Sequence, residues 1–270
     1  MTKDLQGKVI WITGASSGIG RALALEAAAL GARVILSGRR RSVLDEVSLE
    51  CKERGAQAGA VICFDLENPE ARAEACAAAP TLLGALDILV LNAGVSQRAT
   101  FLETSPETFD RVMNLDFAAQ VDMVRRCLPA MVRRRSGCLV AISSIAGLAG
   151  APLRPAYSSA KHALAGLFQN LRSELTGTGV RVVTIFPGYV RTAVARNALN
   201  ADGKPAASDD PHIESGFDSV PVARRILRAV RGGSVEVKVA FDLKSRFGLF
   251  LSRRMPGTWA SLSRKHAGLE

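Results

Sequence analysis

The sequence has no long hydrophobic run, and its first residues lack the pattern of a secretory signal peptide. No apolar run approaches the ~18–20 residues that a membrane-spanning helix needs. Residues 1–8 also lack the apolar region of a secretory signal peptide. The cysteines are odd in number and form no C-x-x-C pair, so we expect no metal site and predict small, buried thiols in a reducing compartment, the cytoplasm. These residues are Cys51, Cys63, Cys76, Cys127 and Cys138.

Acidic residues are fewer than basic ones. The 270-residue chain has 25 Asp and Glu against 35 Lys and Arg, a formal charge of +10. Arginines cluster between Arg125 and Arg135, without the interleaved aromatic residues that stack nucleic-acid bases. Because cations favour a helix C-terminus, we expect this cluster to end a helix and not to bind nucleic acid. The 48% hydrophobic content suffices for a core in one α/β domain of ordinary size.

A glycine-rich turn links a predicted strand to a predicted helix near the N-terminus. Lys8–Thr13 has the apolar pattern of a buried strand, and Arg21–Leu30 favours a helix that ends at Gly31. Glycines between them allow a tight turn and a close approach to a pyrophosphate, while the helix N-terminus supplies N–H groups. A βα turn without a ligand is the alternative. The expected cofactor contacts are Gly14, Ser16, Ser17, Gly18, Ile19 and Gly20.

The end of the second predicted strand, Arg33–Ser37, bears on the choice between NAD and NADP. In NAD-binding sheets a carboxylate near this point holds the ribose 2′-hydroxyl. Here Gly38 stands in that place, followed by Arg39, Arg40 and Arg41. An arginine fork matches a 2′-phosphate, which a carboxylate would repel. We therefore expect NADP(H), with Arg39 at the 2′-phosphate, although the arginines can also cap the following helix.

Two further predicted strands end in residues suited to the same cofactor. The strand over 57–64 is followed by Asp65 and Leu66. The Asp65 carboxylate either accepts a hydrogen bond from the adenine amine or caps the helix that begins near residue 68. The strand over 86–91 is followed by small residues that let the cofactor ribose approach. They are Asn92, Ala93 and Gly94.

A Tyr-x-x-x-Lys pair opens a predicted helix in the middle of the chain. Tyr157 and Lys161 stand at i and i+4, on one helix face and roughly 5–6 Å apart at Cβ. An ammonium beside a phenol favours the phenolate, which makes the phenol a better acid and base near neutral pH. Upstream, Ser143 and Ser144 close the predicted strand 137–142, where a hydroxyl can bind the same substrate oxygen. Taken alone, the pair also fits a solvated surface.

Six separated motifs occur in the order and at the spacings of one family. They are Thr13-Gly14-x-x-x-Gly18-x-Gly20, Asn92-Ala93-Gly94, Asn114, Ser144, Tyr157-x-x-x-Lys161 and Pro187-Gly188. Over roughly residues 7 to 195 the chain resembles a short-chain dehydrogenase/reductase, nearest to the NADP-preferring, hydroxysteroid-dehydrogenase-like branch. One departure is Leu91, where many relatives carry a second asparagine.

The resemblance implies roles for particular residues. Tyr157 would be the acid/base, and Lys161 would favour its phenolate and hold the nicotinamide ribose. Ser144, with twelve residues between it and Tyr157 as in the relatives' spacing, would polarise the substrate carbonyl, and Asn114 would place a water behind Lys161. Around the nicotinamide carboxamide and the pyrophosphate, the implied contacts are Pro187, Gly188, Val190 and Thr192.

The sequence thus predicts a doubly wound α/β domain with a parallel sheet (a Rossmann fold) over residues 1–240, followed by an extension over 241–270. Residues 193–218 are polar and irregular, and similar proteins use this loop over the substrate. Its residue His212 receives no role. The resemblance also implies a homodimer or homotetramer, formed through the long helix predicted over 104–135 and the helix over 157–176.

The leading functional hypothesis is NADP(H)-dependent interconversion of a ketone and a secondary alcohol on a lipophilic substrate. The alternatives are a reductase of 3-oxoacyl thioesters carried by an acidic carrier protein or coenzyme A, and a cofactor-binding sensor that does no chemistry. The intact catalytic residues argue against the sensor. The expected apolar pocket residues are Val95, Phe101, Leu148, Ala149, Ala151, Pro152 and Leu153.

The extension combines cations with bulky apolar side chains. Basic and apolar residues at helical spacing fit an interfacial helix on anionic lipid. The other hypothesis, favoured by the break at Pro256–Gly257, is a tail that caps the substrate pocket or clasps a second subunit, which would bury Phe247, Phe250 and Trp259. The cations are Lys244, Arg246, Arg253, Arg254, Arg264 and Lys265.

Overall fold

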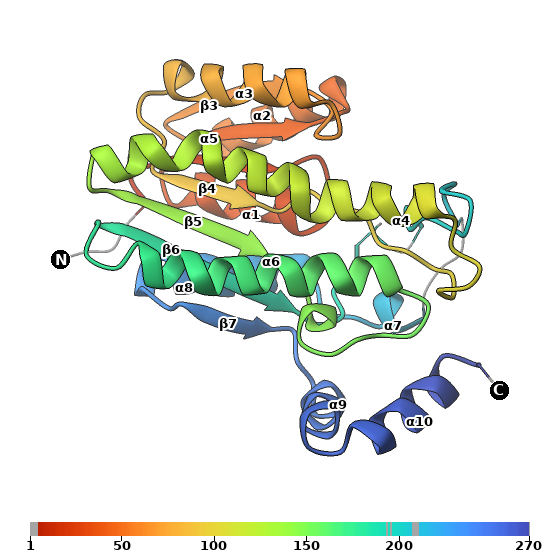
Figure 1. Cartoon of the computed structure of the whole chain (residues 1–270). Helices are drawn as coiled ribbons and strands as arrows, with labels where there is room; N and C mark the ends of the chain where they lie inside the picture. The colour runs from red at the N-terminus through yellow and green to blue at the C-terminus, as the bar shows by residue number, and fades with distance from the viewer. Residues whose placement is uncertain (1–4, 193, 195, 207–210, 270) are drawn as a thin grey trace.

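A seven-stranded parallel sheet forms the centre of the molecule in the computed structural model, with helices on both faces (Figure 1). The structure describes residues 5–192, 194, 196–206 and 211–269. The strand order is β3-β2-β1-β4-β5-β6-β7, and every pair is parallel. The strands β1 to β7 span Val9–Thr13, Arg33–Gly38, Ala58–Cys63, Ile88–Leu91, Gly137–Ile142, Val180–Pro187 and Glu236–Val239.

The helices divide into two layers. On one face α1, α2 and α8 pack on the sheet, and on the other α3, α5 and α6 do so. The first layer spans Gly18–Ala29, Arg41–Glu53 and Ser219–Gly232, and the second spans Pro69–Leu82, Ala119–Arg133 and Pro155–Glu174. The remaining helices are α4 (Pro106–Met113), α7 (Pro211–Glu214), α9 (Leu243–Arg254) and α10 (Pro256–His266), with a 3-10 turn, η2, over Ile145–Gly147. This is the doubly wound fold that the sequence predicts.

The strand order reverses between β1 and β4. From β1 the chain builds outward to β2 and β3, and from β4 it builds outward on the other side to β7. The crevice outside the carboxyl ends of the strands at such a switch point is where parallel α/β sheets bind ligands. The strands β1 and β4 are wholly buried and almost entirely apolar because helices cover both faces of the sheet. The fold therefore positions a ligand beyond Thr13 and Leu91.

The long helix predicted over 104–135 is interrupted. A π-helical turn, η1, spans Asn114–Ala118 between α4 and α5. Such turns insert one residue into an α-helix and occur often at functional sites. The inserted residue re-aims the side chains of the turn, and Asp116 within it is fully buried. The sequence alone predicts a continuous helix here, so the prediction is wrong at this turn.

The prediction that all cysteines are buried is wrong for one of them. The thiols of Cys51, Cys76, Cys127 and Cys138 are buried and free, but Cys63, at the exposed end of β3, is accessible. Strand β3 lies at the sheet edge, where its residues are only partly buried and the last of them, Cys63, is exposed. Among the residues that the structure describes, no helix is both long and apolar enough to cross a membrane.

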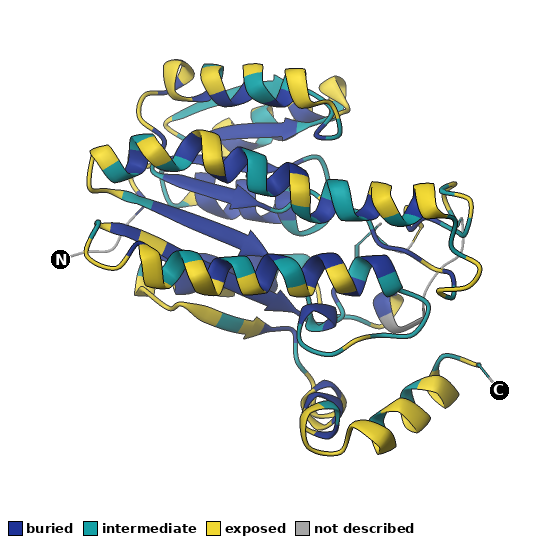
Figure 2. Cartoon of the chain, viewed as in Figure 1, coloured by how far each residue is buried: buried dark blue, intermediate teal, exposed yellow. Residues whose placement is uncertain are grey.

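The extension forms two helices that project beyond one end of the sheet (Figure 1). Helix α9 begins with Asp242 as its cap and ends before Met255, where Pro256 starts α10. Figure 2 shows that α10 is largely exposed, and none of its described residues is buried. The predicted break at Pro256 is thus present, and it divides the extension into two short helices.

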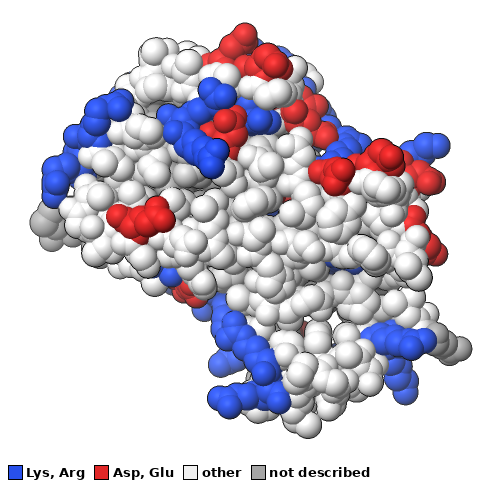
Figure 3. Space-filling view, viewed as in Figure 1, with Lys and Arg blue, Asp and Glu red and all other residues white. Residues whose placement is uncertain are grey.

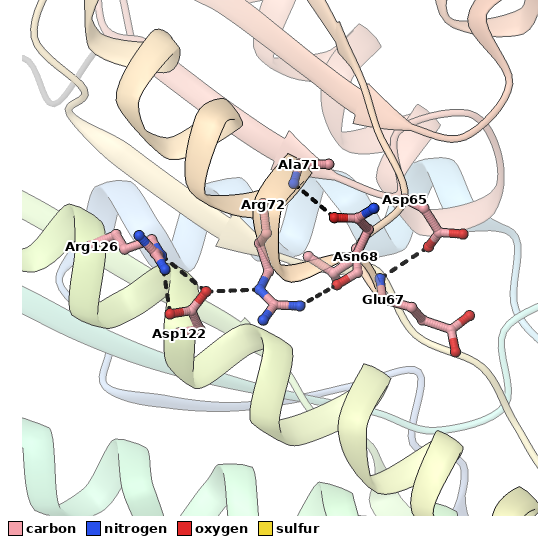
Figure 4. Close-up of polar contacts among 8 residues, drawn as sticks. Asp65, Glu67, Asn68, Ala71, Arg72, Asp122 and Arg126 are labelled. Carbon is pink, nitrogen blue, oxygen red and sulfur yellow. Dashed lines mark hydrogen bonds and ion pairs between the residues drawn. The ribbon is translucent and has the colours of Figure 1, made fainter.

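A buried arginine supports the loop after β3. Arg72 of α3 donates to the carbonyl of Leu66 at 2.6 Å and to the Asp122 carboxylate of α5 at 2.8 Å (Figure 4). Arg126, one turn further along α5, also donates to Asp122 at 3.0 Å. Burial raises the pKa of the Asp122 carboxyl, but these two arginines outweigh burial and the net pKa is lowered. The network fixes the loop that contains Asp65 and Leu66 against α5.

We expect Asp122→Asn to lower the free energy of unfolding at neutral pH by about 1–3 kcal/mol, the size of a hydrogen bond to a charged group. A carboxyl whose pKa is lowered by folding stabilises the protein above its unfolded pKa of about 3.9, and this stabilisation is lost as pH falls. Urea unfolding over a pH series should therefore show the difference shrinking below about pH 4. Asp45→Asn, in an exposed pair with Arg41, is the control and should change stability little. A difference that does not vary with pH would contradict this assignment.

Candidate active site

A cavity of about 1380 Å³ opens at the carboxyl ends of the central strands. It is lined by the residues that end or follow β1, β4, β5 and β6, among them Thr13, Asn92, Ser144 and Pro187. The volume exceeds the ~300–1,000 Å³ typical of a site for one drug-sized ligand. Its extent fits a dinucleotide together with a second molecule at the inner end.

The glycine turn after β1 is built for close approach. Gly14 has a φ of 66°, in the left-handed region, and a Cβ at Gly20 would lie 2.3 Å from the Gly14 carbonyl oxygen. The turn places the N-terminus of α1 at the cavity wall, where its N–H groups and the helix dipole favour binding of a phosphate. Gly20 is not among the residues that line the cavity, and its close approach to Gly14 shapes the turn; its contact with a cofactor stays a prediction.

Asn92 joins the two central turns. Its side-chain amide donates to the carbonyls of Thr13 at 2.9 Å and Gly14 at 3.3 Å. The backbone N–H groups of Asn92 and Ala93 both donate to the Thr13 hydroxyl at 3.0 Å. The Asn92 side chain thus fixes the glycine turn against the end of β4, a structural task that sequence reasoning did not assign to it.

The three consecutive arginines after β2 do not share one role. Arg39 and Arg40 line the cavity, whereas Arg41 pairs with Asp45 one turn along α2 at 3.0 Å. Arg40 also donates to the Ser16 hydroxyl at 3.2 Å. The guanidinium of Arg39 lies 4.0 Å from the Asp65 carboxylate. Two exposed guanidinium groups therefore stand at the outer end of the cavity, beside the glycine turn.

The remaining predicted cofactor residues converge on the same cavity. Those that line it are Gly14, Ser16, Ser17, Gly18, Ile19, Asp65, Leu66, Asn92, Ala93, Gly94, Pro187, Gly188, Val190 and Thr192. The methyl group of Thr192 stands 2.9 Å from the position of a Cβ on Gly18. The loop after β6 thus closes over the glycine turn from the opposite side. A dinucleotide that spans the cavity would contact both.

Tyr157 and Lys161 face the inner part of the cavity from the first turns of α6. The Lys161 ammonium lies 5.6 Å from the centre of the Tyr157 ring. Helix α6 begins at Pro155, which suits the first turn because its missing N–H needs no partner there. The predicted i, i+4 arrangement is therefore present and points into the site.

The two adjacent serines after β5 differ in their partners. The Ser143 hydroxyl is buried and donates to the Lys161 carbonyl at 3.0 Å. Both serines line the cavity, but the Ser144 hydroxyl accepts from the Ala146 N–H at 3.1 Å, so its proton remains available. Ser143 thus fixes α6 against the end of β5, and Ser144 is the serine placed for a ligand.

Lys161 is held by a carboxylate that sequence reasoning missed. Its ammonium lies 3.0 Å from the Asp116 carboxylate and 3.3 Å from the Ile142 carbonyl. The two charged side chains are only 4% and 0% exposed. The second oxygen of Asp116 accepts the Val95 N–H at 2.7 Å, and a Cβ on Gly94 would lie 2.9 Å from that carboxylate. Asp116 therefore ties the α6 lysine to the turn after β4.

Burial and pairing act in opposite senses on these two groups. Burial disfavours the ammonium, but the Asp116 carboxylate and Tyr157 together outweigh burial, and the pKa of Lys161 is raised above its ordinary value. Burial raises the pKa of the Asp116 carboxyl, and the nearby ammonium opposes that shift. A buried ammonium without a counter-charge would lose its proton readily. Asp116 therefore keeps Lys161 charged inside the site.

Asn114 lies in the same π-turn but does not reach the cavity wall. It is half-buried and is not among the residues that line the cavity, whereas Leu115 and Asp116 are. Its role in a water relay stays a prediction. The available sequence signal for Asp116 was an acid flanked by Leu115 and Phe117 inside a helix, two residues after Asn114.

The inner cavity wall is apolar with basic residues around it. Val95, Ala149, Ala151, Pro152 and Leu153 line it as predicted, together with Trp259 and Leu262 of α10. Phe101 and Leu148 do not. Phe101 is 68% exposed and packs edge-on against Phe109. Arginines that the sequence did not single out also line the cavity, Arg98, Arg111 and Arg154.

The loop predicted over 193–218 carries part of this wall. Residues 193, 195 and 207–210 and the side chain of His212 lie outside the described part of the chain. Within the described part, Leu199 pairs with Gln97 and Phe217 pairs with Val190 in single β-bridges. Leu199 and Phe217 line the cavity. The predicted substrate loop thus borders the site where the structure describes it.

Comparison with known proteins agrees with this geometry. The family model for short chain dehydrogenases matches residues 8–203. Dehydrogenase/reductase SDR family member 7B of Bos taurus is 36% identical over 275 residues, which cover 100% of this chain and 84% of that protein. Dehydrogenase/reductase SDR family member 7 of Mus musculus is 33% identical over 262 residues, covering 96% and 77%.

Solved structures show the same fold. A short-chain dehydrogenase/reductase from Burkholderia phymatum, in complex with NAD, matches with a TM-score of 0.82 at 23% identity over 96% of each chain. A short-chain dehydrogenase from Sphingobium yanoikuyae, in complex with NADPH, matches with a TM-score of 0.79 at 23% identity over 93% of this chain and 95% of that one. Because the family model matches residues 8–203 and the relatives match over most of their length, the chain belongs to the short-chain dehydrogenase/reductase family. Members of this family are oxidoreductases that use NAD or NADP.

Proposed function

We propose that the protein is an NADP(H)-dependent oxidoreductase that interconverts a ketone and a secondary alcohol on a lipophilic small molecule. The observation that carries the proposal is the convergence of Ser144, Tyr157 and Lys161 on one apolar cavity. A hydroxyl, a phenol and a buried ammonium are the groups that proton transfer at a carbonyl oxygen needs. A non-catalytic sensor would have no need of all three.

Each of these residues has a separate task in the proposed reaction. The bound nicotinamide supplies or takes the hydride. In the reducing direction Tyr157 donates its phenolic proton to the substrate oxygen, and Ser144 donates a hydrogen bond to the same oxygen. Lys161 stabilises the phenolate that remains, because its ammonium is fixed beside the ring. In the oxidising direction the phenolate removes the alcohol proton.

The outer end of the cavity supports NADP(H) over NAD(H). Two guanidinium groups, Arg39 and Arg40, stand there, and the carboxylate that would hold a ribose 2′-hydroxyl is replaced by Gly38. Relatives of this fold bind either cofactor, since the Burkholderia phymatum protein holds NAD and the Sphingobium yanoikuyae protein holds NADPH. The assignment of NADP(H) to this chain therefore depends on its own residues Arg39 and Arg40.

A second candidate substrate is a 3-oxoacyl thioester. The observation that favours it is the set of cations that line the cavity around its apolar wall, Arg98, Arg154 and Lys244. A carrier protein or coenzyme A is anionic and would be attracted by them. A screen of ketones, secondary alcohols and 3-oxoacyl thioesters with NADPH or NADP⁺ distinguishes the two candidates.

We also propose a cytoplasmic homodimer or homotetramer, formed as in similar proteins through α5 and α6. The proposal rests on the family resemblance and on the position of α5 and α6, which lie in the same helical layer on one face of the sheet. Gel filtration with light scattering measures the oligomeric state.

We expect Arg39→Ala to reduce the preference for NADPH over NADH by roughly 10- to 100-fold, as for the loss of a charge-assisted hydrogen bond. Fluorescence titration of both cofactors measures the preference. Arg41→Ala removes the same charge from the same segment, but Arg41 pairs with Asp45, so it should leave the preference nearly unchanged. Equal affinity of the unmodified protein for NADPH and NADH would contradict the assignment of NADP(H).

We expect Tyr157→Phe to retain NADPH binding and lose turnover by ~10²-fold or more, because the general acid is removed and the ring is kept. Steady-state kinetics on a substrate from the screen, together with a cofactor titration, separate the two effects. Tyr189→Phe removes the other tyrosine hydroxyl of the cavity wall and should change turnover only a few-fold. Full activity of Tyr157→Phe would show that another group transfers the proton.

A further inference from the structure

One face of α9 carries an exposed apolar stripe. Leu243, Phe247 and Phe250 follow at intervals of four and three residues, which places them on one side of the helix. Their exposed fractions are 82%, 60% and 56%. Arg254 continues the same side four residues after Phe250, at the end of the helix. Large apolar side chains in a row, exposed and bordered by cations, mark a surface that contacts something else.

The opposite side of α9 is buried and packs against α10. Gly248, Leu249 and Leu251 are buried, and the Trp259 ring of α10 packs on Gly248, where a Cβ would lie 2.9 Å from the ring. Asp242 caps the helix by accepting the Ser245 N–H at 2.7 Å. The buried side of α9 thus packs within the protein, while the three side chains of the stripe stay largely exposed.

A basic hollow of about 480 Å³ adjoins the stripe. Its cations come from three elements: Arg225 of α8, Lys238 of β7, and Arg246, Arg253 and Arg254 of α9. No acidic residue is among the described residues that line it. Figure 3 shows basic side chains gathered beside the extension on the side of β7.

We propose that this surface, formed by the stripe of α9 and the basic hollow and here called the α9 face, binds the surface of an anionic lipid membrane. The apolar stripe would enter the boundary between headgroups and acyl chains, and the cations would meet lipid phosphates. The geometry suits this partner because α9, which carries the stripe, projects beyond the sheet (Figure 1), where a flat membrane surface can reach it.

Charge argues against a second copy on the same surface. In a two-fold dimer the same patch meets itself, so the five cations of the hollow would face their own copies without acids between them. An acidic protein would satisfy the charges. However, three bulky apolar side chains on a projecting helix need a fluid apolar layer or a matching groove, and a membrane supplies both the layer and the negative charge.

The α9 face also borders the mouth of the active-site cavity. Phe247 belongs to the stripe and lines the cavity, and so do Trp259 and Leu262 of α10. A lipophilic substrate could therefore pass from the bilayer to Tyr157 along an apolar wall. This last step rests on the proposed function, but membrane binding does not, and vesicle binding is measured without turnover.

The experiment is co-sedimentation of the full chain with vesicles of phosphatidylcholine, with and without phosphatidylglycerol, at low and high salt. We expect pelleting only with the anionic vesicles and a marked loss at high salt, because screening weakens the attraction. Combined Arg246→Gln, Arg253→Gln and Arg254→Gln should weaken binding roughly 100-fold, given the contribution of each cation at such a surface. Leu243→Ser with Phe250→Ser should also lose binding.

The control variant combines Lys52→Gln, Arg125→Gln and Arg133→Gln, three exposed cations on α2 and α5. It has the same net charge as the α9 variant and should pellet as the unmodified protein does. Thermal unfolding checks that each variant is folded. The proposal is overturned if the unmodified protein does not pellet at low salt, if it pellets equally with neutral vesicles, or if the control loses as much binding. Binding only to an acidic protein, or a dimer that Phe250→Ser dissociates, would also overturn it.

Discussion

The buried ion pair between Asp116 and Lys161 is the constraint on which the site depends. An ammonium that is 4% exposed keeps its charge only beside a counter-charge. Asp116 supplies that charge, and its second oxygen holds the turn after β4 through Val95. Lys161 also donates to Ile142 at the end of β5. One pair thus connects α6, the π-turn and two strand ends, and it fixes the cation beside Tyr157.

Other features of the fold position the glycine turn and Ser144 around this pair. The reversal of strand order between β1 and β4 opens the crevice, and Asn92 locks the glycine turn against the end of β4. Ser143 fixes α6 to the end of β5, so that the neighbouring Ser144 faces the cavity. The protein therefore uses hydrogen bonds between adjacent turns to orient catalytic groups that come from distant parts of the chain.

Strand and turn positions could be predicted from the sequence because they depend on local patterns. Buried apolar runs and a glycine turn located β1 to β5 within a few residues, and helical spacing placed Tyr157 and Lys161 together. The role of Asp116 could not be predicted in this way, because the orientation of its side chain depends on a π-turn that no local sequence pattern predicts. The exposure of Cys63 and of the apolar stripe of α9 likewise depends on which surfaces the rest of the chain leaves uncovered. NADP preference and the α9 face remain proposals.

The most direct test of the ion pair is the charge of Lys161 itself. Carbon NMR of protein labelled at lysine Cε follows the ionisation of each ammonium, and the Lys161→Met variant identifies the signal. The pair predicts that the pKa of Lys161 in the unmodified protein lies above the ordinary lysine value of about 10.4, and that Asp116→Asn lowers this pKa. A Lys161 that loses its proton near neutral pH in the unmodified protein, or that titrates identically in Asp116→Asn, would contradict the account.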